Sequence, residues 1–196
     1  MLIRSFKMAA LALSGLALAG CVEITSAPPG PFKVGGAQVT LGHEWSNMNA
    51  VTPLRSAKVT LLTVDGPLLN RLYISDALTP GEGLVLSAVK EKPAPTIKSG
   101  LSNAERIEFV TDSIAALDYQ RVQALKPRPG SYAGHPGVRF DISANTADGL
   151  DVVGTALAAE VDGKTYVILY LAPSEHYFQA NLAEVEQIIA SAKLGG

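Results

Sequence analysis

The chain has 196 residues, with 16 Lys and Arg against 18 Asp and Glu, so its net charge at neutral pH is −2. Such a balance lacks the extended basic field that holds nucleic acid through its phosphates, and we expect no nucleic-acid partner. Cys21 is the only cysteine, which excludes a disulfide framework and a zinc site built from several thiolates.

The first 20 residues have the pattern of an export signal. Arg4 and Lys7 precede an apolar run over residues 8–18, and no acidic residue occurs before it. A membrane-spanning helix needs about 20 apolar residues, so this run is too short to remain as a permanent span. We therefore predict that residues 1–20 are a signal peptide that is removed during export.

The end of this segment resembles the lipobox of bacterial lipoproteins, because Leu18, Ala19 and Gly20 directly precede Cys21. The resemblance implies that the Cys21 thiol receives a diacylglycerol, that cleavage occurs before it, and that its amino group is then acylated, with palmitate for example. Two or three acyl chains together hold a protein durably on a membrane. The alternative is an incidental thiol in an ordinary secretory signal.

The residues after Cys21 bear on location and on domain limits. Val22, where Asp would be the retention signal, implies by the sorting rules of similar enterobacterial lipoproteins that the protein reaches the periplasmic face of the outer membrane. Residues 21–36 are rich in proline and glycine and have no periodicity, which predicts a flexible tether. Residues 37–196 would then form a single domain, and a chain beginning near Phe32 should fold.

The first predicted elements of this domain are strands. Residues 37–41 have strand composition, and two further apolar runs lie on either side of Asp65 and Gly66, a dipeptide suited to a tight hairpin turn. Residues 78–100 show no sustained pattern, and no element is predicted there.

Two amphipathic helices are predicted. The first begins at a possible capping box of Ser102 and Glu105, and the second begins after Pro173 with Ser174 as its cap. Apolar residues recur at helical spacing in both: Ile107, Val110, Ile114 and Leu117 in the first, and Phe178, Leu182, Val185 and Ile189 in the second. Each helix should therefore bury one face.

The clearest strands lie between these helices. Val138, Phe140 and Ile142 alternate with Arg139, Asp141 and Ser143, which predicts one buried and one wet face. Residues 151–161 form the next strand, and one of its faces carries small side chains that could admit a helix closely. Asp162 and Gly163 then predict a tight hairpin turn. The strand that follows is apolar on both faces, so we expect it near the centre of the sheet.

The mature chain resembles the PsbP-like α/β/α sandwich family. The resemblance covers roughly residues 37–194 and rests on "GVRFDIS", "VDGKTYVILYLAP" and "YFQANLAEVEQIIASAKL". It implies an α+β fold with a mainly antiparallel sheet flanked by helices. It also implies an accessory, protein-binding domain without a cofactor, rather than an enzyme.

The stretch "KPRPGSYAGHPG", residues 126–137, is the main candidate for a recognition surface. Lys126, Arg128, Tyr132 and His135 bring cationic, aromatic and hydrogen-bonding groups into one short segment, a mixture enriched at protein interfaces. The plain alternative is a solvated connection between strands. Residues 90–98 are a second exposed candidate.

The alternative class is a periplasmic hydrolase or metal-dependent enzyme whose site is scattered in sequence. "HEWSN" begins like a helical zinc motif, but Asn47 stands where the second histidine would be needed. We therefore predict no metal site and no catalytic residue. A deep pocket in which His43, His135 or His176 meets a carboxylate would favour the enzyme.

Overall fold

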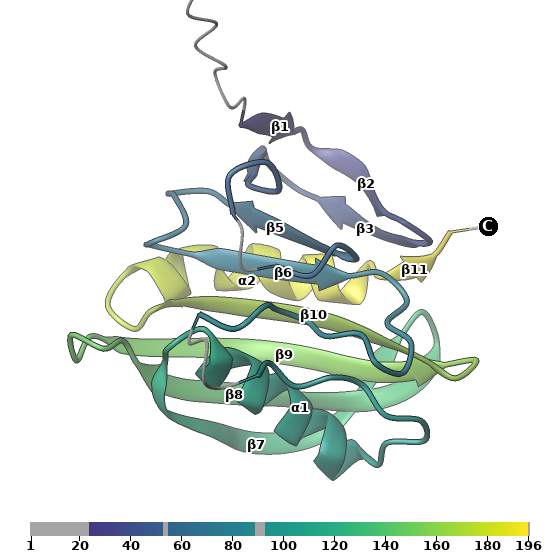
Figure 1. Ribbon diagram of the computed structural model, residues 1–196. Helices are drawn as coiled ribbons and strands as arrows, with labels where there is room; N and C mark the ends of the chain where they lie inside the picture. The colour runs from purple at the N-terminus through teal and green to yellow at the C-terminus, as the bar shows by residue number, and fades with distance from the viewer. Residues whose placement is uncertain (1–23, 53–54, 89–92, 196) are drawn as a thin grey trace, which may run out of the picture.

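The computed structural model describes residues 24–52, 55–88 and 93–195 (Figure 1). The signal segment, the lipobox and Cys21 lie outside this part of the chain. The elements are β1 (Thr25–Ala27), β2 (Gly30–Val34), β3 (Ala37–Leu41), β4 (Trp45–Asn47), β5 (Val59–Thr63), β6 (Arg71–Ser75), α1 (Asn103–Ala116), β7 (Gln120–Tyr132), β8 (His135–Asn145), β9 (Asp151–Val161), β10 (Lys164–Pro173), α2 (Tyr177–Ala190) and β11 (Lys193–Leu194). Neither helix in the described part is long and apolar enough to cross a membrane.

An antiparallel sheet of eight strands forms the middle layer, in the order β1-β4-β5-β6-β10-β9-β8-β7. Helix α1 lies on one face of this sheet, and α2 lies on the other together with a small sheet of order β11-β3-β2 (Figure 1). β10 lies between β6 and β9 and is buried along nearly its whole length. The predicted central position of this strand is confirmed.

Each face of the large sheet has its own apolar core. Phe109, Val110 and Ile114 of α1 pack against the face that carries Phe140 and Ala156. On the opposite face, α2 packs its buried residues against the sheet and against β3; the members of this second core include Val39, Leu41, Leu157, Ile168, Tyr170, Val185, Ile188 and Ile189. The small side chains of β9 face α1, as its alternation predicts.

The predicted capping box of α1 is confirmed. The Glu105 backbone N–H donates to Ser102 Oγ at 3.3 Å, and the Ser102 backbone N–H donates to Glu105 Oε2 at 2.7 Å. These bonds satisfy two N–H groups that have no partner inside the helix. Hydrogen bonding to Ser102 also lowers the pKa of the Glu105 carboxyl.

The predicted cap of α2 is wrong. The residue before the helix is His176, with φ 67°, and its side chain makes no capping hydrogen bond. The backbone N–H of Ser174 instead donates to the Asp151 carbonyl at 3.0 Å. Ser174 is therefore still tied to the end of the sheet, and α2 starts two residues later than a cap at Ser174 predicts.

The hairpin turns differ in how far they match the prediction. Asp162 and Gly163 have φ of 51° and 74° and join β9 directly to β10, which confirms the two-residue turn. Asp65 and Gly66 do not form a tight turn, because residues 64–70 form a longer connection. The buried Asn70 side chain holds it by accepting from Thr63 Oγ1 and the Val64 N–H, both at 2.8 Å.

The predicted tether over residues 21–36 is wrong for its described part. β1 pairs with β4 at the edge of the large sheet, and β2 pairs with β3 in the small sheet. Ala27 is fully buried and Val34 nearly so. The prolines of this segment made its strands unrecognisable from the sequence. Pro31 is tolerated because β2 is an edge strand of the small sheet, where one N–H can be missing without loss of a hydrogen bond between strands. The domain therefore begins well before residue 37.

The stretch over residues 126–137 is a hairpin rather than a loop. β7 continues to Tyr132 and β8 starts at His135, so that only Ala133 and Gly134 form the turn. β7 is the second edge of the large sheet, and it contains Pro127 and Pro129. Its register shifts between residues 120 and 123 and again between 125 and 128, where Arg121 and Lys126 have φ of 51° and 48°.

Candidate functional site

A groove of about 540 Å³ lies between α2 and the face of β7, β8 and β9 that looks toward this helix. Its lining residues are Leu125, Lys126, Arg128, Asp141, Ile142, Val153, Gly154, Thr155, Ser174, Phe178, Gln179, Leu182 and Glu186. The groove exists because α2 packs on β3, β9 and β10, and β7 remains largely exposed beyond it. It is the candidate functional site of the domain.

Strand alternation explains which side chains reach the groove. On β8, Phe140 and Ile142 belong to the core beneath α1, so Arg139 and Asp141 project from the opposite face, toward α2. The register places Arg128 of β7 opposite Arg139, and Leu125 opposite Asp141. The bulge at Lys126 inserts the extra residue that keeps both Leu125 and Arg128 on this face.

Asp141 is the centre of a charged cluster on the sheet side of the groove. Arg128 Nη1 lies 2.9 Å from Asp141 Oδ1, and Lys126 Nζ lies 3.9 Å from Asp141 Oδ2. The Lys126 side chain is 82% exposed, so its charge faces water and contributes little to stability. Two cations share one carboxylate here, which leaves this side of the groove with an excess of positive charge.

A second ion pair joins the sheet to α2 beside the groove. Arg139 Nη2 lies 2.8 Å from Glu186 Oε1 and also donates to Thr155 Oγ1 at 2.8 Å. Nε of the same guanidinium is buried and has no hydrogen-bond partner among the described residues. The Arg139 side chain is therefore held between the helix and the sheet through Nη2, while Nε takes no part.

Apolar side chains line the rest of the groove. Phe178 and Leu182 come from the first two turns of α2, while Leu125 and Val153 come from the sheet. The Phe178 ring stacks on Tyr170 with 5.7 Å between the ring centroids, which fixes its position over the sheet. Leu125 is 42% exposed although it is a large apolar residue. The groove thus combines an apolar lining with cations at its rim.

The four residues proposed from the sequence do not form one surface. Lys126 and Arg128 line the groove, but Tyr132 is completely buried and stacks on Tyr166 with centroids 5.0 Å apart. Burial raises the pKa of the Tyr132 hydroxyl far above its usual range. His135 is exposed at the turn, beyond the groove. Tyr132 is therefore a core residue, and its predicted place on a recognition surface is wrong.

Several groove residues were not proposed from the sequence. The alternation of its strand predicts that Asp141 is exposed, but it does not predict which residues contact Asp141. Phe178 and Leu182 read as core-facing positions of α2, and Glu186 as a solvent-facing one. Only the packing of α2 beside β9, rather than over β8, shows that all three border one groove.

The three histidines lie apart. His43 stacks on Trp45 with centroids 5.5 Å apart, and its Nδ1 is 3.1 Å from the Glu44 carbonyl oxygen. His135 and His176 lie at opposite ends of β10, since the first is at the end where β9 turns into β10 and the second follows its last residue. Among the described residues, no group of three or more His, Cys, Asp and Glu could hold a metal ion.

Two further hollows lie on the other face of the molecule, beside α1. They measure about 460 and 540 Å³ and share Pro93 and Pro95 in their linings. Pro93, which lines both, directly follows in sequence residues 89–92, which lie outside the described part of the chain. No histidine lines either of them or the groove.

The three layers define an α+β sandwich of the PsbP and Mog1 type, which confirms the predicted fold class. The solution structure of the cyanobacterial PsbP protein CyanoP from Synechocystis sp. PCC 6803 matches with a TM-score of 0.51 and 11% identity, over 93% of this chain and 98% of that one. The Ran-binding protein Mog1p of Saccharomyces cerevisiae matches with a TM-score of 0.51 and 9% identity, over 88% and 96%.

At such identities the likeness concerns the fold alone. LpqN of Mycobacterium tuberculosis, a protein involved in cell envelope biogenesis, aligns over 91% of this chain and 88% of its own with 9% identity, but its TM-score of 0.37 is too low to establish a common fold. No protein-family model and no curated protein sequence matches the chain.

Proposed function

We propose that the protein is a lipid-anchored component of the bacterial envelope whose domain binds another envelope protein through the groove between α2 and β7–β9. The observation that carries the proposal is the mixed lining of this groove, where Leu125, Phe178 and Leu182 lie beside the charges of Lys126 and Arg128. The proposal assigns no catalytic step to the domain.

The chemistry of the groove indicates the kind of partner. Exposed apolar side chains gain free energy when a partner covers them, and cations at a rim select and steer a partner of opposite charge. A protein segment that carries both apolar and acidic side chains satisfies both conditions. The known Ran-binding role of Mog1p supports the proposal in one respect, since it shows that a sandwich of this type can carry a protein-binding surface.

The anchor is proposed from the lipobox-like residues Leu18, Ala19 and Gly20 before Cys21, and the outer-membrane location from Val22. The test is metabolic labelling with a fatty-acid probe. Wild type should be labelled and should leave the membrane with detergent but not with high salt, because buried acyl chains are insensitive to ionic screening. Cys21→Ser should not be labelled. An unlabelled wild type that is released by salt would refute the anchor.

Binding through the groove is tested by cross-linking in living cells from a photoreactive residue at position 125. The captured partner should be lost when Lys126 and Arg128 are both changed to Glu, because the rim then repels an acidic segment. Arg121→Glu is the matched control, since Arg121 is an exposed cation on the same strand and does not line the groove. Equal capture by the double variant and the control would refute the groove as the binding site.

A further inference from the structure

We infer that the lipid anchor and the groove lie at opposite ends of the molecule, so that the domain presents the groove to the aqueous layer and away from the membrane that holds it. The inference rests on the proposed anchoring at Cys21. Such an orientation fixes which end of the domain lies at the bilayer and where the partner must be.

The link between the anchor and the folded domain is short. Three residues separate Cys21 from Thr25, the first residue of β1. Even fully extended, the chain between these two Cα atoms spans at most about 14 Å. Thr25 is itself paired with Asn47 of β4, and Ala27 is fully buried, so β1 cannot lengthen the link without breaking the edge of the sheet. The start of β1 is thus held close to the lipid surface.

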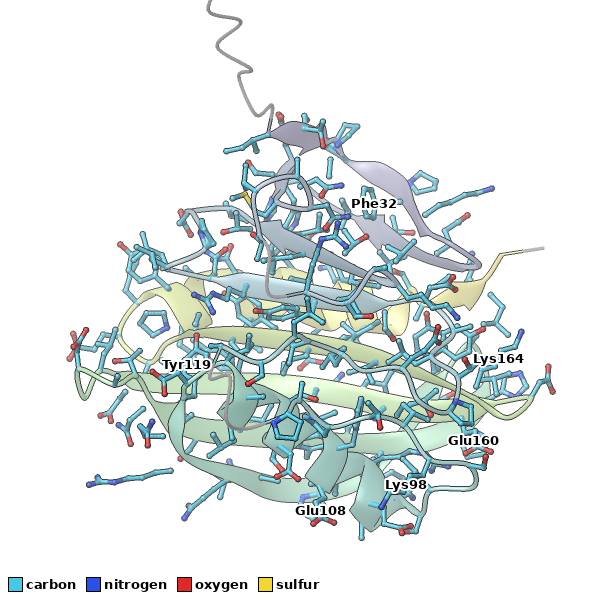
Figure 2. All side chains as sticks on the ribbon, in the orientation of Figure 1. Phe32, Lys98, Glu108, Tyr119, Glu160 and Lys164 are labelled. Atoms are coloured by element: carbon cyan, nitrogen blue, oxygen red, sulfur yellow. The ribbon has the colours of Figure 1, made fainter. Side chains whose placement is uncertain are left out.

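The groove lies at the far edge of the same sheet. β1 and β7 are the two edge strands of the eight-stranded sheet, and neighbouring strands are about 4.8 Å apart, so the edges are separated by roughly 34 Å along the sheet. Figure 1 shows β1 at one end of the domain and β7 at the opposite end. In Figure 2, Phe32 of β2 marks the first end and Glu108 of α1 lies toward the other.

Charge disfavours a domain that tips over onto the face with α1. This face exposes Glu105, Glu108 and Asp112, with Lys98 beside them (Figure 2 labels Glu108 and Lys98). An anionic phospholipid surface repels acidic side chains and attracts basic ones. The opposite face carries Lys126 and Arg128 at the rim of the groove, next to Glu186. The short link lets these cations reach the same membrane only if that face lies flat against it.

The partner therefore approaches from the aqueous side. The groove extends from β9, about 24 Å from β1 along the sheet, to β7, about 34 Å from β1. It is therefore out of reach of a protein buried in the same bilayer, but it is open to a protein dissolved in the periplasm or extending from another layer of the envelope. Lys126 and Arg128 at the rim would meet the acidic surface of such a partner first and guide it into the groove.

The orientation is measured on the lipidated full-length protein in vesicles of phosphatidylethanolamine and phosphatidylglycerol. Because Cys21 is the only cysteine and its thiol is consumed by lipid, a single introduced cysteine can be labelled cleanly with a fluorophore. Thr25→Cys places the fluorophore at the edge near the anchor, and Lys126→Cys places it on β7; both positions are exposed. A lipid-attached quencher should reduce the emission of the first fluorophore several-fold more than that of the second.

Equal quenching at both positions would show a domain lying flat and would overturn the inference. A second protein, with 20 Gly and Ser residues inserted between Val22 and Glu23, tests the role of the short link, since such a linker spans about 25 Å on average. The insertion should reduce the quenching at Thr25→Cys. Unchanged quenching would overturn the claim that the link sets the orientation. Wild type that does not sediment with vesicles and takes no fatty-acid label refutes the proposed anchor instead, so the two failures are distinguishable.

Discussion

Arg139 of β8 and Glu186 of α2 form an ion pair with 2.8 Å between Nη2 and Oε1, and its two members differ sharply in exposure. The Arg139 side chain is 10% exposed, whereas that of Glu186 is 47% exposed. If the carboxylate is lost, the guanidinium cannot turn to water, and its Nε already lacks a partner among the described residues. Loss of the ion pair is therefore more costly when Arg139 is the residue left unpaired than when Glu186 is.

Glu186→Ala should lower the free energy of unfolding by about 1 kcal/mol, because it leaves a mostly buried cation with Thr155 as its remaining side-chain partner. Urea unfolding measures this. Gln187→Ala is the control, since Gln187 is an exposed neighbour on the same helix, and it should have little effect. Identical stability for the two variants would show that the pair does not link α2 to the sheet.

Gly163→Val should destabilise the domain by about 1 kcal/mol or more. Gly163 has φ 74°, a conformation that a β-branched residue adopts only with strain, while a Cβ at this position would meet no atom within 4 Å. The cost is therefore the strain of the new side chain against its own backbone, with no clash against other residues. Asn tolerates this conformation better, so Gly163→Asn should lose less. Thermal melting compares the variants, and an equal loss for Val and Asn would contradict this account of the turn.

Two buried tyrosines should respond in opposite ways to loss of the hydroxyl. The Tyr170 hydroxyl donates to the Tyr177 carbonyl at 3.1 Å, so Tyr170→Phe should cost about 1 kcal/mol. The Tyr132 hydroxyl is buried without a partner among the described residues, so Tyr132→Phe should leave stability unchanged or raise it. Urea unfolding of both variants tests the contrast. A larger loss for Tyr132→Phe would show that its hydroxyl has a partner.

Stability should fall at alkaline pH. Burial raises the pKa of Tyr73 to about 12 and that of Tyr170 to about 12, against about 10 for an exposed tyrosine. Between these pH values the unfolded chain loses protons that the folded chain keeps, so the free energy of unfolding decreases as pH rises from about 10 to about 12. Unfolding in urea across this range measures the slope. Tyr73→Phe should make it shallower, and an unchanged slope would contradict the raised pKa.

A chain beginning at Phe32 should be less stable than one beginning at Ile24. The shorter chain lacks β1 and the first two residues of β2, so β4 loses one of its two partner strands. Trp45, which is 1% exposed, also loses Ala27 from its surroundings. Melting of both chains without the signal segment provides the measurement. Equal melting temperatures would mean that β1 adds nothing to the fold.

The parts of the fold that could be predicted are those that depend on residues close together in sequence. The capping box of Ser102 and Glu105 and the turn at Asp162 and Gly163 depend on residues next to one another in sequence, and both are present. β1 was missed because its pairing with β4 links segments some twenty residues apart and no alternation marks a strand of three residues. The cap of α2 was misplaced because the partner of Ser174 is Asp151, on another strand.

The candidate site was predictable only in part for the same reason. Lys126 and Arg128 stood out by composition, and both line the groove. Tyr132 also stood out by composition. It belongs to a strand that was not predicted, and the alternation of that strand directs its side chain into the core. Glu186 joins the site through Arg139, which is 47 residues away in sequence. Such a contact depends on how α2 is placed on the sheet, and the sequence pattern of neither element contains that information.

The two edges of the large sheet are also the places where the chain could polymerise. An open edge offers unpaired N–H and C=O groups to another chain, and long flat edges invite aggregation. β1 has only three residues, and β7 has two residues without an N–H, Pro127 and Pro129, and two bulges that break its ladder. Neither edge offers a long regular template for a strand from a second copy. Copies of the protein crowded on a surface would therefore stay separate, although no other element in the described part of the chain covers either edge of the large sheet.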